Sequence, residues 1–203
     1  MRILFLLIIT SLIGCKKETA ADVSLLRDGD IIFQTSTSAQ SRAIQLATHT
    51  EYSHCGIVYK DKGRYFVFEA IQPVTKTPLS AWIARGKDSH YTVKRLKDTR
   101  ALTPLALTKM KTAARAMNGK NYDLYFEWSD DRIYCSELIW KLYKNATGLE
   151  VGHLKKLKDF NLSAPAVQQK MKERYGNNIP MDEKVISPAD IYNSDLLKTV
   201  IEK

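Results

Sequence analysis

The stretch "YSHCGIVYKDKGRYFVFEA", residues 52–70, holds two runs of β-branched and aromatic residues around a charged turn that contains a glycine. Two such runs around a short turn are typical of a β-hairpin. If residues 60–63 form the turn, His54 lies directly opposite Glu69. Directly opposed residues share one face of a sheet, with Cβ atoms about 5 Å apart. The hairpin therefore predicts an imidazole beside a carboxylate, a pair that serves as base and orienting group in nucleophilic catalysis.

Cys55 follows His54 and is expected to point to the other face of the strand, because strand side chains alternate. We therefore expect that His54 and Cys55 do not line the same site. The pairing of His54 with Glu69 depends on the length of the turn, since a one-residue change would place Glu69 on the other face.

The segments around the hairpin predict further strands and helices. "RDGDIIFQ", residues 27–34, reads as a turn and a strand, and an α-helix is expected at each of residues 38–50, 103–119, 163–176 and 187–200. A further helix holds Cys135, and Asn145 and Gly148 mark its end. Strands early in the chain and helices later favour an α+β fold.

"DRIYCSELIW", residues 131–140, places a cysteine in the first turn of the helix that begins at Cys135. The free backbone N–H groups and partial positive charge of a helix N-terminus favour a thiolate over a thiol. The same N–H groups can bind a developing oxyanion. A nucleophilic Cys135 with His54 as its base is one interpretation; a buried cysteine, a core histidine and an edge glutamate is the plain alternative.

The sequence has three cysteines, Cys15, Cys55 and Cys135. In an oxidising compartment, a disulfide between Cys55 and Cys135 is a serious alternative to a reactive thiol. A zinc site is poorly supported, because neither a CxxC nor an HxxxH spacing occurs. We expect no metal and no cofactor.

"MRILFLLIITSLIGC", residues 1–15, has one basic residue followed by an apolar run that is too short to span a bilayer. Its end resembles the lipobox of bacterial lipoproteins. This predicts a signal peptide over residues 1–14, a lipidated tether over 15–24 that begins at Cys15, and one domain over 25–203. A plain signal or anchor with a chance cysteine is the alternative. Two or three acyl chains on Cys15 would suffice for stable membrane anchoring.

The chain is basic, with 31 Lys and Arg against 22 Asp and Glu and a formal net charge of +9. This balance favours anionic surroundings such as phospholipid headgroups or cell-wall carboxylates. No recognition motif for nucleic acid is visible, so we expect no nucleic-acid partner. The sequence does not indicate an oligomeric state.

Four segments in order, "LRDGDIIFQ", "YSHCGIVYKDKGRYFVFEA", "GKNYDLYFEWSDDRIYCSELIWKLY" and "ISPADIYNSDLL", resemble the permuted papain-like amidase family. This is the YiiX-like branch of the NlpC-type cysteine hydrolases, and the resemblance covers about residues 25–200. It implies a circularly permuted papain-like fold, with an antiparallel sheet or barrel packed on helices. It also implies that Cys135 is the nucleophile, His54 the base and Glu69 the polar third member.

The resemblance implies a lipid-anchored enzyme of the bacterial cell envelope that cleaves a peptide or N-acyl amide through a thioester. Related permuted folds, such as the lecithin:retinol acyltransferase-like proteins, act on lipid acyl groups, so a lipid acyl hydrolase or acyltransferase is an alternative. A non-catalytic lipoprotein that binds lipid or peptide is a second alternative. Tyr134 and Gln34 are candidate oxyanion donors, although packing is the simpler role for each of these two. Tyr52 could line the cleft.

Overall fold

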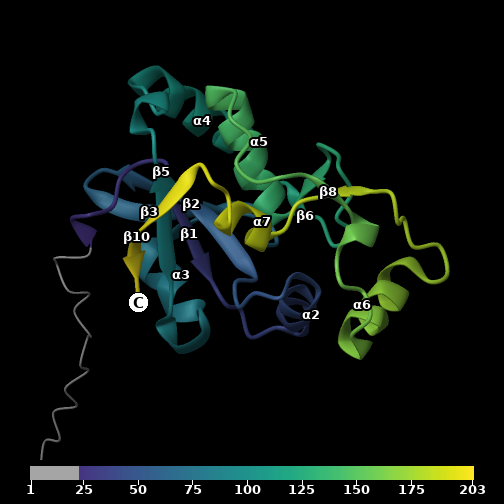
Figure 1. Ribbon diagram of the computed structural model, residues 1–203. Coiled ribbons are helices and arrows are strands. Elements are labelled where there is room, and N and C mark those ends of the chain that lie inside the picture. The colour runs from purple at the N-terminus through teal and green to yellow at the C-terminus, as the bar shows by residue number, and fades with distance from the viewer. Residues whose placement is uncertain (1–22) are drawn as a thin grey trace, which may run out of the picture.

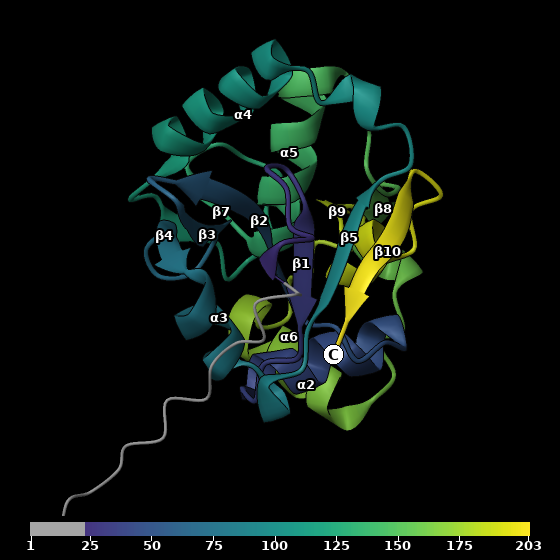
Figure 2. The same ribbon diagram turned by 90° about the vertical axis from the view of Figure 1, so that its left-hand side faces the viewer.

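The computed structural model describes residues 23–203. The predicted signal peptide and Cys15 lie outside the described residues. The core is a six-stranded sheet with the strand order β10-β5-β1-β2-β3-β4, in which every neighbouring pair is antiparallel (Figures 1 and 2). Its strands are β1 (Ile31–Gln34), β2 (His54–Asp61), β3 (Arg64–Glu69), β4 (Thr75–Pro78), β5 (Thr92–Leu96) and β10 (Leu197–Glu202).

The hairpin forms as predicted, but its turn has two residues instead of four. Asp61 pairs with Arg64 across Lys62 and Gly63, and the register continues to Ile57 opposite Phe68. Gly63 has a φ of +80° and Lys62 a φ of +46°, which is the backbone that tight two-residue hairpins require. The prediction that His54 lies directly opposite Glu69 is therefore wrong by two residues. A shift of two residues preserves the face, so the two side chains still lie on the same side of the sheet.

The helices cover both faces of the sheet, and helices and sheet together confirm the predicted α+β fold. They are α2 (Ala39–Thr48), α3 (Leu79–Arg85), α4 (Pro104–Met117), α5 (Cys135–Thr147), α6 (Pro165–Tyr175) and α7 (Pro188–Tyr192). Helices α4 and α5 pack against each other over one face, and α3 packs on the opposite face (Figure 2). Helix α2 lies beside α6 at one end of the molecule (Figure 1).

Odd- and even-numbered residues of β2 belong to different cores, as strand alternation requires. Ile57 and Tyr59 pack with Leu138 of α5 in the larger core. Val58 packs with Trp82 of α3 in the smaller core. The strand is therefore buried on both faces, and a residue at its end can reach either layer.

The expected helix over residues 187–200 is wrong in its second half. Ser187 caps the short helix α7 through its bond from the Asp190 N–H, and the chain then turns into strand β10. Residues 197–202 read "LKTVIE", and Leu197 and Ile201 are buried while the residues between them are more exposed. Leu197 belongs to the larger core and Ile201 to the smaller one, because the register of β10 against β5 shifts between Thr199 and Ile201. The segment is therefore an irregular strand on one edge of the sheet.

Short strand pairs connect the helices around the sheet. Strands β6 (Asn121–Tyr122) and β7 (Arg132–Ile133) form a parallel pair just before α5, and β8 (Lys155–Lys156) pairs with β9 (Lys184–Val185). Within residues 23–203 no helix is both long and apolar enough to cross a bilayer.

Candidate active site

Cys135 is the first residue of α5 and is 2% exposed. The helix is anchored at this end by three contacts. The Glu137 carboxylate accepts a bond from the Tyr134 N–H at 3.3 Å, the Ser136 hydroxyl donates to the Ile186 carbonyl at 2.8 Å, and the Ile186 N–H donates to the Tyr134 hydroxyl at 3.1 Å. The first turn is thus held by residues other than Cys135, which leaves its thiol free to face the sheet.

His54 begins strand β2 and binds Glu69 through its Nε2 atom, 2.6 Å from Oε2. Gly56 makes this diagonal contact possible, because it lies opposite Glu69 and carries no side chain. A Cβ at Gly56 would be 2.3 Å from Val67 Cγ1 and 3.4 Å from Glu69 Cβ. Glu69 therefore reaches past Gly56 to the imidazole on the same face of the sheet.

Glu69 is fully buried and is held by side chains from a segment that the sequence left without an assignment. Its Oε1 accepts from the Thr77 hydroxyl at 2.6 Å, and its Oε2 accepts from Trp82 Nε1 at 3.0 Å and Arg85 Nη2 at 2.5 Å. Burial raises the pKa of Glu69, but the bonds from His54, Arg85 and Thr77 outweigh it and lower the pKa to about 2. Glu69 is therefore an anion fixed on the imidazole.

The imidazole of His54 also hydrogen-bonds the Cys135 sulfur. Because Nε2 binds Glu69, Nδ1 is the nitrogen that faces the sulfur. Burial lowers the pKa of His54, but the bonds to Cys135 and Glu69 raise it to about 9. The pKa of Cys135 lies well below its usual value, mainly because of a hydrogen bond from Cys55 and also because of His54. Both shifts favour a thiolate–imidazolium pair over a neutral thiol and imidazole.

Cys55 contributes to the same site, contrary to the expectation from strand alternation. It does point away from His54, into the larger core, but α5 packs on that face and places Cys135 against it. Strand β3 pairs with β2 only up to Phe68, so Cys55 lies beyond the last pair. Both its thiol and its backbone N–H bond the Cys135 sulfur. Burial and this contact raise the pKa of the Cys55 thiol, so Cys55 stays a donor; both thiols are free.

Two hollows meet at the Cys135–His54 pair. Cys135 lines an almost wholly apolar cavity of about 80 Å³ between α2, α6 and the segment before α7. His54 lines a cleft of about 530 Å³ whose residues mainly have polar side chains, Ser36, Ser53 and Arg85 among them, and we call it the polar cleft, although carbon atoms make most of its exposed surface. Gln40, Ile44 and Tyr122 line both hollows, so the two are neighbours that share these residues as a wall.

The structure places the three other candidate residues, Gln34, Tyr134 and Tyr52, in different surroundings. Gln34 is 1% exposed, lies opposite His54 on β1 and lines the polar cleft. Tyr134 lines the apolar cavity.

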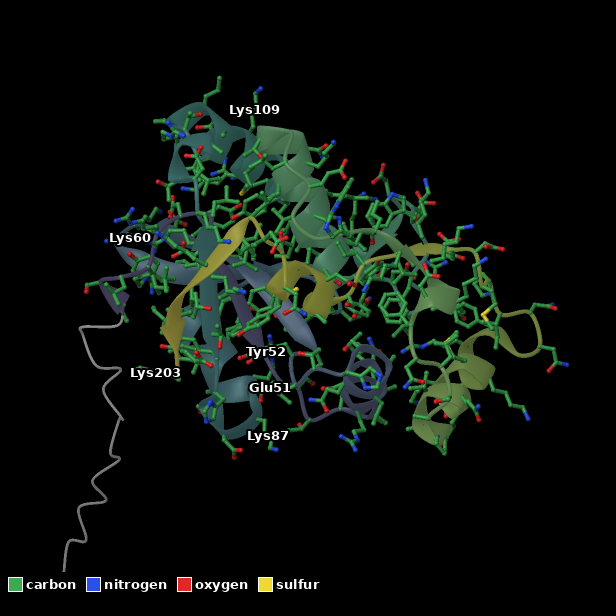
Figure 3. All side chains as sticks on the ribbon, viewed as in Figure 1. Glu51, Tyr52, Lys60, Lys87, Lys109 and Lys203 are labelled. Carbon is green, nitrogen blue, oxygen red and sulfur yellow. The ribbon has the colours of Figure 1, made fainter. Side chains whose placement is uncertain are left out.

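Tyr52 lines neither hollow. Its hydroxyl is 2.7 Å from Thr92 Oγ1 and its ring stacks on Tyr192. It lies beside Glu51 in the loop before β2 (Figure 3). The structure therefore gives Tyr52 a packing contact and places Gln34 and Tyr134 on opposite sides of the Cys135–His54 pair.

Basic side chains project from several elements of the fold. The labelled lysines Lys60, Lys87, Lys109 and Lys203 project from widely separated parts of the surface (Figure 3). Over the described part of the chain, no group of three or more His, Cys, Asp or Glu side chains could hold a metal ion.

The partners of Glu69 in β4 and α3 are the site residues that sequence reasoning missed. Trp82 and Arg85 are three residues apart, which places them on one face of a helix. That spacing is a signal for a short amphipathic helix, but nothing in it connects the helix to Glu69. Only the pairing of β4 with β3 brings this segment to the carboxylate.

Comparisons with known proteins identify the family and relatives of the chain. Residues 25–201 match the sequence profile of the family described as "Permuted papain-like amidase enzyme, YaeF/YiiX, C92 family". The chain is 50% identical over 175 residues to the uncharacterized protein YiiX of Escherichia coli strain K12, which covers 86% of both chains. The crystal structure of YiiX from Escherichia coli O157:H7, titled a metalloprotein, superposes with a TM-score of 0.83 at 49% identity. That match covers 87% of this chain and 97% of the other.

Proposed function

Because the chain belongs to the permuted papain-like amidase family of YaeF and YiiX, we propose that it is a cysteine hydrolase that cleaves an amide bond through a thioester. The observation that supports this most strongly is the continuous hydrogen-bonded chain from the Cys135 sulfur through His54 to the buried anion Glu69. This arrangement provides a nucleophile, a general base and an orienting group.

In the proposed reaction, the Cys135 thiolate attacks the carbonyl carbon of the amide and forms a tetrahedral intermediate. The imidazolium of His54 gives its proton to the nitrogen, the C–N bond breaks and the amine leaves. Water, deprotonated by His54, then attacks the thioester, and the S–C bond breaks to release the carboxylic acid and restore the thiolate. Glu69 holds the imidazole in position and stabilises its charged form throughout.

The developing oxyanion needs hydrogen-bond donors close to the sulfur. The first backbone N–H groups of α5 have no partner within the helix, and they carry the positive end of the helix dipole. We infer that the Cys135 N–H is one donor, since it lies nearest to the attacking sulfur. Gln34 on the His54 side is the candidate for the second donor, because it lies beside the imidazole on β1.

The substitution Cys135→Ala tests the mechanism. The variant should cleave no amide that the wild type cleaves, because no thioester can form without the sulfur. Cys55→Ser is the matched control, since it changes the neighbouring thiol and leaves the proposed nucleophile in place. Full amide cleavage by Cys135→Ala would rule out the mechanism.

A lipid acyl hydrolase or acyltransferase is the second candidate, and the apolar cavity beside Cys135 is the observation that favours it. Carbon atoms make almost all of its exposed wall, from residues such as Ala43, Leu162 and Val167, and Lys170 and Arg174 lie at its margin. An acyl chain would be desolvated there while its carbonyl faces the sulfur.

Mass spectrometry of intact protein separates the two candidates. Wild-type protein is incubated with phospholipid vesicles or with cell-wall stem peptides, and the adduct on Cys135 is identified. A fatty-acyl adduct from the vesicles supports the lipid reaction, whereas a peptidyl adduct supports the amide reaction. An adduct that persists in Cys135→Ala would show that another residue carries it.

We also propose that Cys15 carries the lipid anchor and that the domain works at a membrane of the bacterial cell envelope. The lipobox-like sequence that ends at Cys15 supports this. Metabolic labelling with a radioactive fatty acid should label the wild type and leave Cys15→Ala unlabelled. Equal labelling of the two would contradict the proposal.

A further inference from the structure

The Cys135–His54 pair lies between two hollows whose walls differ in chemistry. The hollow at the sulfur has almost no polar surface, whereas the hollow at the imidazole has a larger polar share, from side chains such as Ser36, Ser53 and Arg85. In the proposed hydrolysis, the acyl group stays on the sulfur, whereas the amine leaves with the proton from His54. The amine is therefore the part of the substrate that should occupy the polar cleft.

Arg85 gives this cleft a charge. Its side chain is 42% exposed and lines the cleft, while its Nη2 atom donates to Glu69 Oε2. No other acceptor in residues 23–203 contacts its remaining N–H groups, and no carboxylate is among the residues that line the cleft. The guanidinium thus has donors left to offer a ligand, in the fork geometry that suits carboxylates.

The position of Arg85 relative to His54 is fixed by their common partner. His54 Nε2 and Arg85 Nη2 bind the same oxygen of Glu69 at 2.6 and 2.5 Å. The two nitrogen atoms are therefore at most about 5 Å apart. Nδ1, from which the proton is transferred, lies across the same imidazole ring, so a group bound by Arg85 lies one ring width further from the nitrogen that His54 protonates.

Gln34 is a second, independent observation at the same cleft. Its side chain is 1% exposed, and its Oε1 atom is buried without a hydrogen-bond partner. Gly86 leaves the room for this amide, since a Cβ there would lie 2.4 Å from Oε1. Because this oxygen faces Gly86 and is closed to the cleft, the amide N–H₂ is the group that Gln34 can offer to a bound ligand, as the proposed oxyanion donor requires.

From these observations, and on the premise of the proposed hydrolysis, we propose that the polar cleft binds the leaving amine and that Arg85 selects an amine that carries a carboxylate. The substrate class is therefore an N-acyl amino acid or a peptide whose carboxylate lies a few bonds from the scissile nitrogen. Its acyl part occupies the apolar cavity, and its carboxylate meets Arg85.

The test uses matched amides that differ only in charge. N-octanoylglycine and N-octanoyl-γ-aminobutyrate are compared with their neutral carboxamide counterparts. Two quantities are measured for each: the cleavage rate, and the concentration that protects Cys135 from alkylation by iodoacetamide. The wild type should prefer at least one carboxylate over its carboxamide by about tenfold to a hundredfold, as charge-assisted hydrogen bonds provide.

Arg85→Gln should reduce this preference to less than about threefold, and Arg85→Lys should keep part of it because the charge remains. Thr77→Val is the matched control, since it removes another Glu69 hydrogen bond but does not line the cleft. The control should keep the preference even if its overall rate falls, which separates binding by Arg85 from its support of Glu69.

The outcomes distinguish the two proposals. Cleavage without any preference for a carboxylate in the wild type overturns the role of Arg85 and leaves the hydrolase intact. Equal loss of preference in Arg85→Gln and Thr77→Val also overturns it. Preferential protection without cleavage supports the binding site and contradicts the hydrolase. If none of the four compounds is cleaved and none protects Cys135, the result contradicts both the binding site and the hydrolase.

Discussion

The protonation state of His54 can be measured directly, and the structure predicts it to be unusual. Burial alone would lower the pKa of this imidazole, but its hydrogen bonds to Cys135 and Glu69 raise the pKa from 6.5 to about 9. One pKa unit corresponds to about 1.4 kcal/mol. After the cost of burial is subtracted, the folded protein therefore stabilises the charged imidazole relative to the neutral one by about 3 kcal/mol. His54 should therefore be a cation at neutral pH.

The perturbations that test this remove one partner at a time. Cys135→Ala removes the thiolate and Glu69→Gln removes the carboxylate, so each should lower the pKa of His54 towards or below 6.5. An NMR titration of the imidazole C–H signals gives the pKa of each histidine. The chain has four histidines, and the signal that disappears in His54→Gln identifies the one of interest.

The raised pKa of His54 should also make the free energy of unfolding depend on pH. Because the folded pKa is raised, the stabilisation is complete below pH 6.5 and is lost as the pH rises through about 9. Chemical denaturation of the wild type at several pH values, compared with His54→Gln, should show this loss only in the wild type. A wild-type His54 that titrates at or below 6.5 in the folded protein would refute the thiolate–imidazolium pair.

Three further predictions concern neighbouring groups. Cys55→Ala should raise the pKa of Cys135, so that the pH profile of Cys135 alkylation shifts to higher pH, whereas Cys55→Ser keeps a donor and should shift the profile less. Identical alkylation profiles in the wild type and Cys55→Ala would show that Cys55 does not act on Cys135. Asp30→Asn should cost about 3–5 kcal/mol in urea denaturation, because it breaks the buried ion pair with Arg95 at 2.6 Å, and should leave Cys135 alkylation unchanged. Burial raises the pKa of Glu137 to about 7, so its contribution to stability is complete below pH 4.5 and is lost as the pH rises through 7. The stability of wild type relative to Glu137→Gln should fall by about 3 kcal/mol over that range, and a constant difference would contradict it.

The hairpin shows what the sequence could determine and what it could not. The two strands follow from residue type and spacing, and the shared face of His54 and Glu69 depends only on the parity of the register. The predicted turn is two residues too long. The pattern of faces cannot reveal this, because a two-residue turn and a four-residue turn place the side chains on the same faces. The diagonal contact additionally needs Gly56, whose role appears only once the strands are paired.

Contacts between distant segments account for the rest. The helix that begins at Cys135 was predictable from its local pattern, but its docking against Cys55 depends on how α5 packs on the sheet. The bonds of Thr77, Trp82 and Arg85 to Glu69 depend on a strand and a helix that have weak local signals. Residues 197–200 were predicted as helix because edge pairing with β5, which stabilises the strand, is not encoded locally.

The order of the elements along the chain has a consequence for biosynthesis. His54 and Glu69 are 15 residues apart and meet within one hairpin, whereas Cys135 arrives much later and the edge strand β10 is made last. A chain grows from its N-terminus, and its early segments can fold before the late ones exist. The acid–base half can thus assemble while the sulfur is still absent, and the reactive thiolate forms only when α5 docks. A nascent or truncated chain would therefore carry no activated nucleophile.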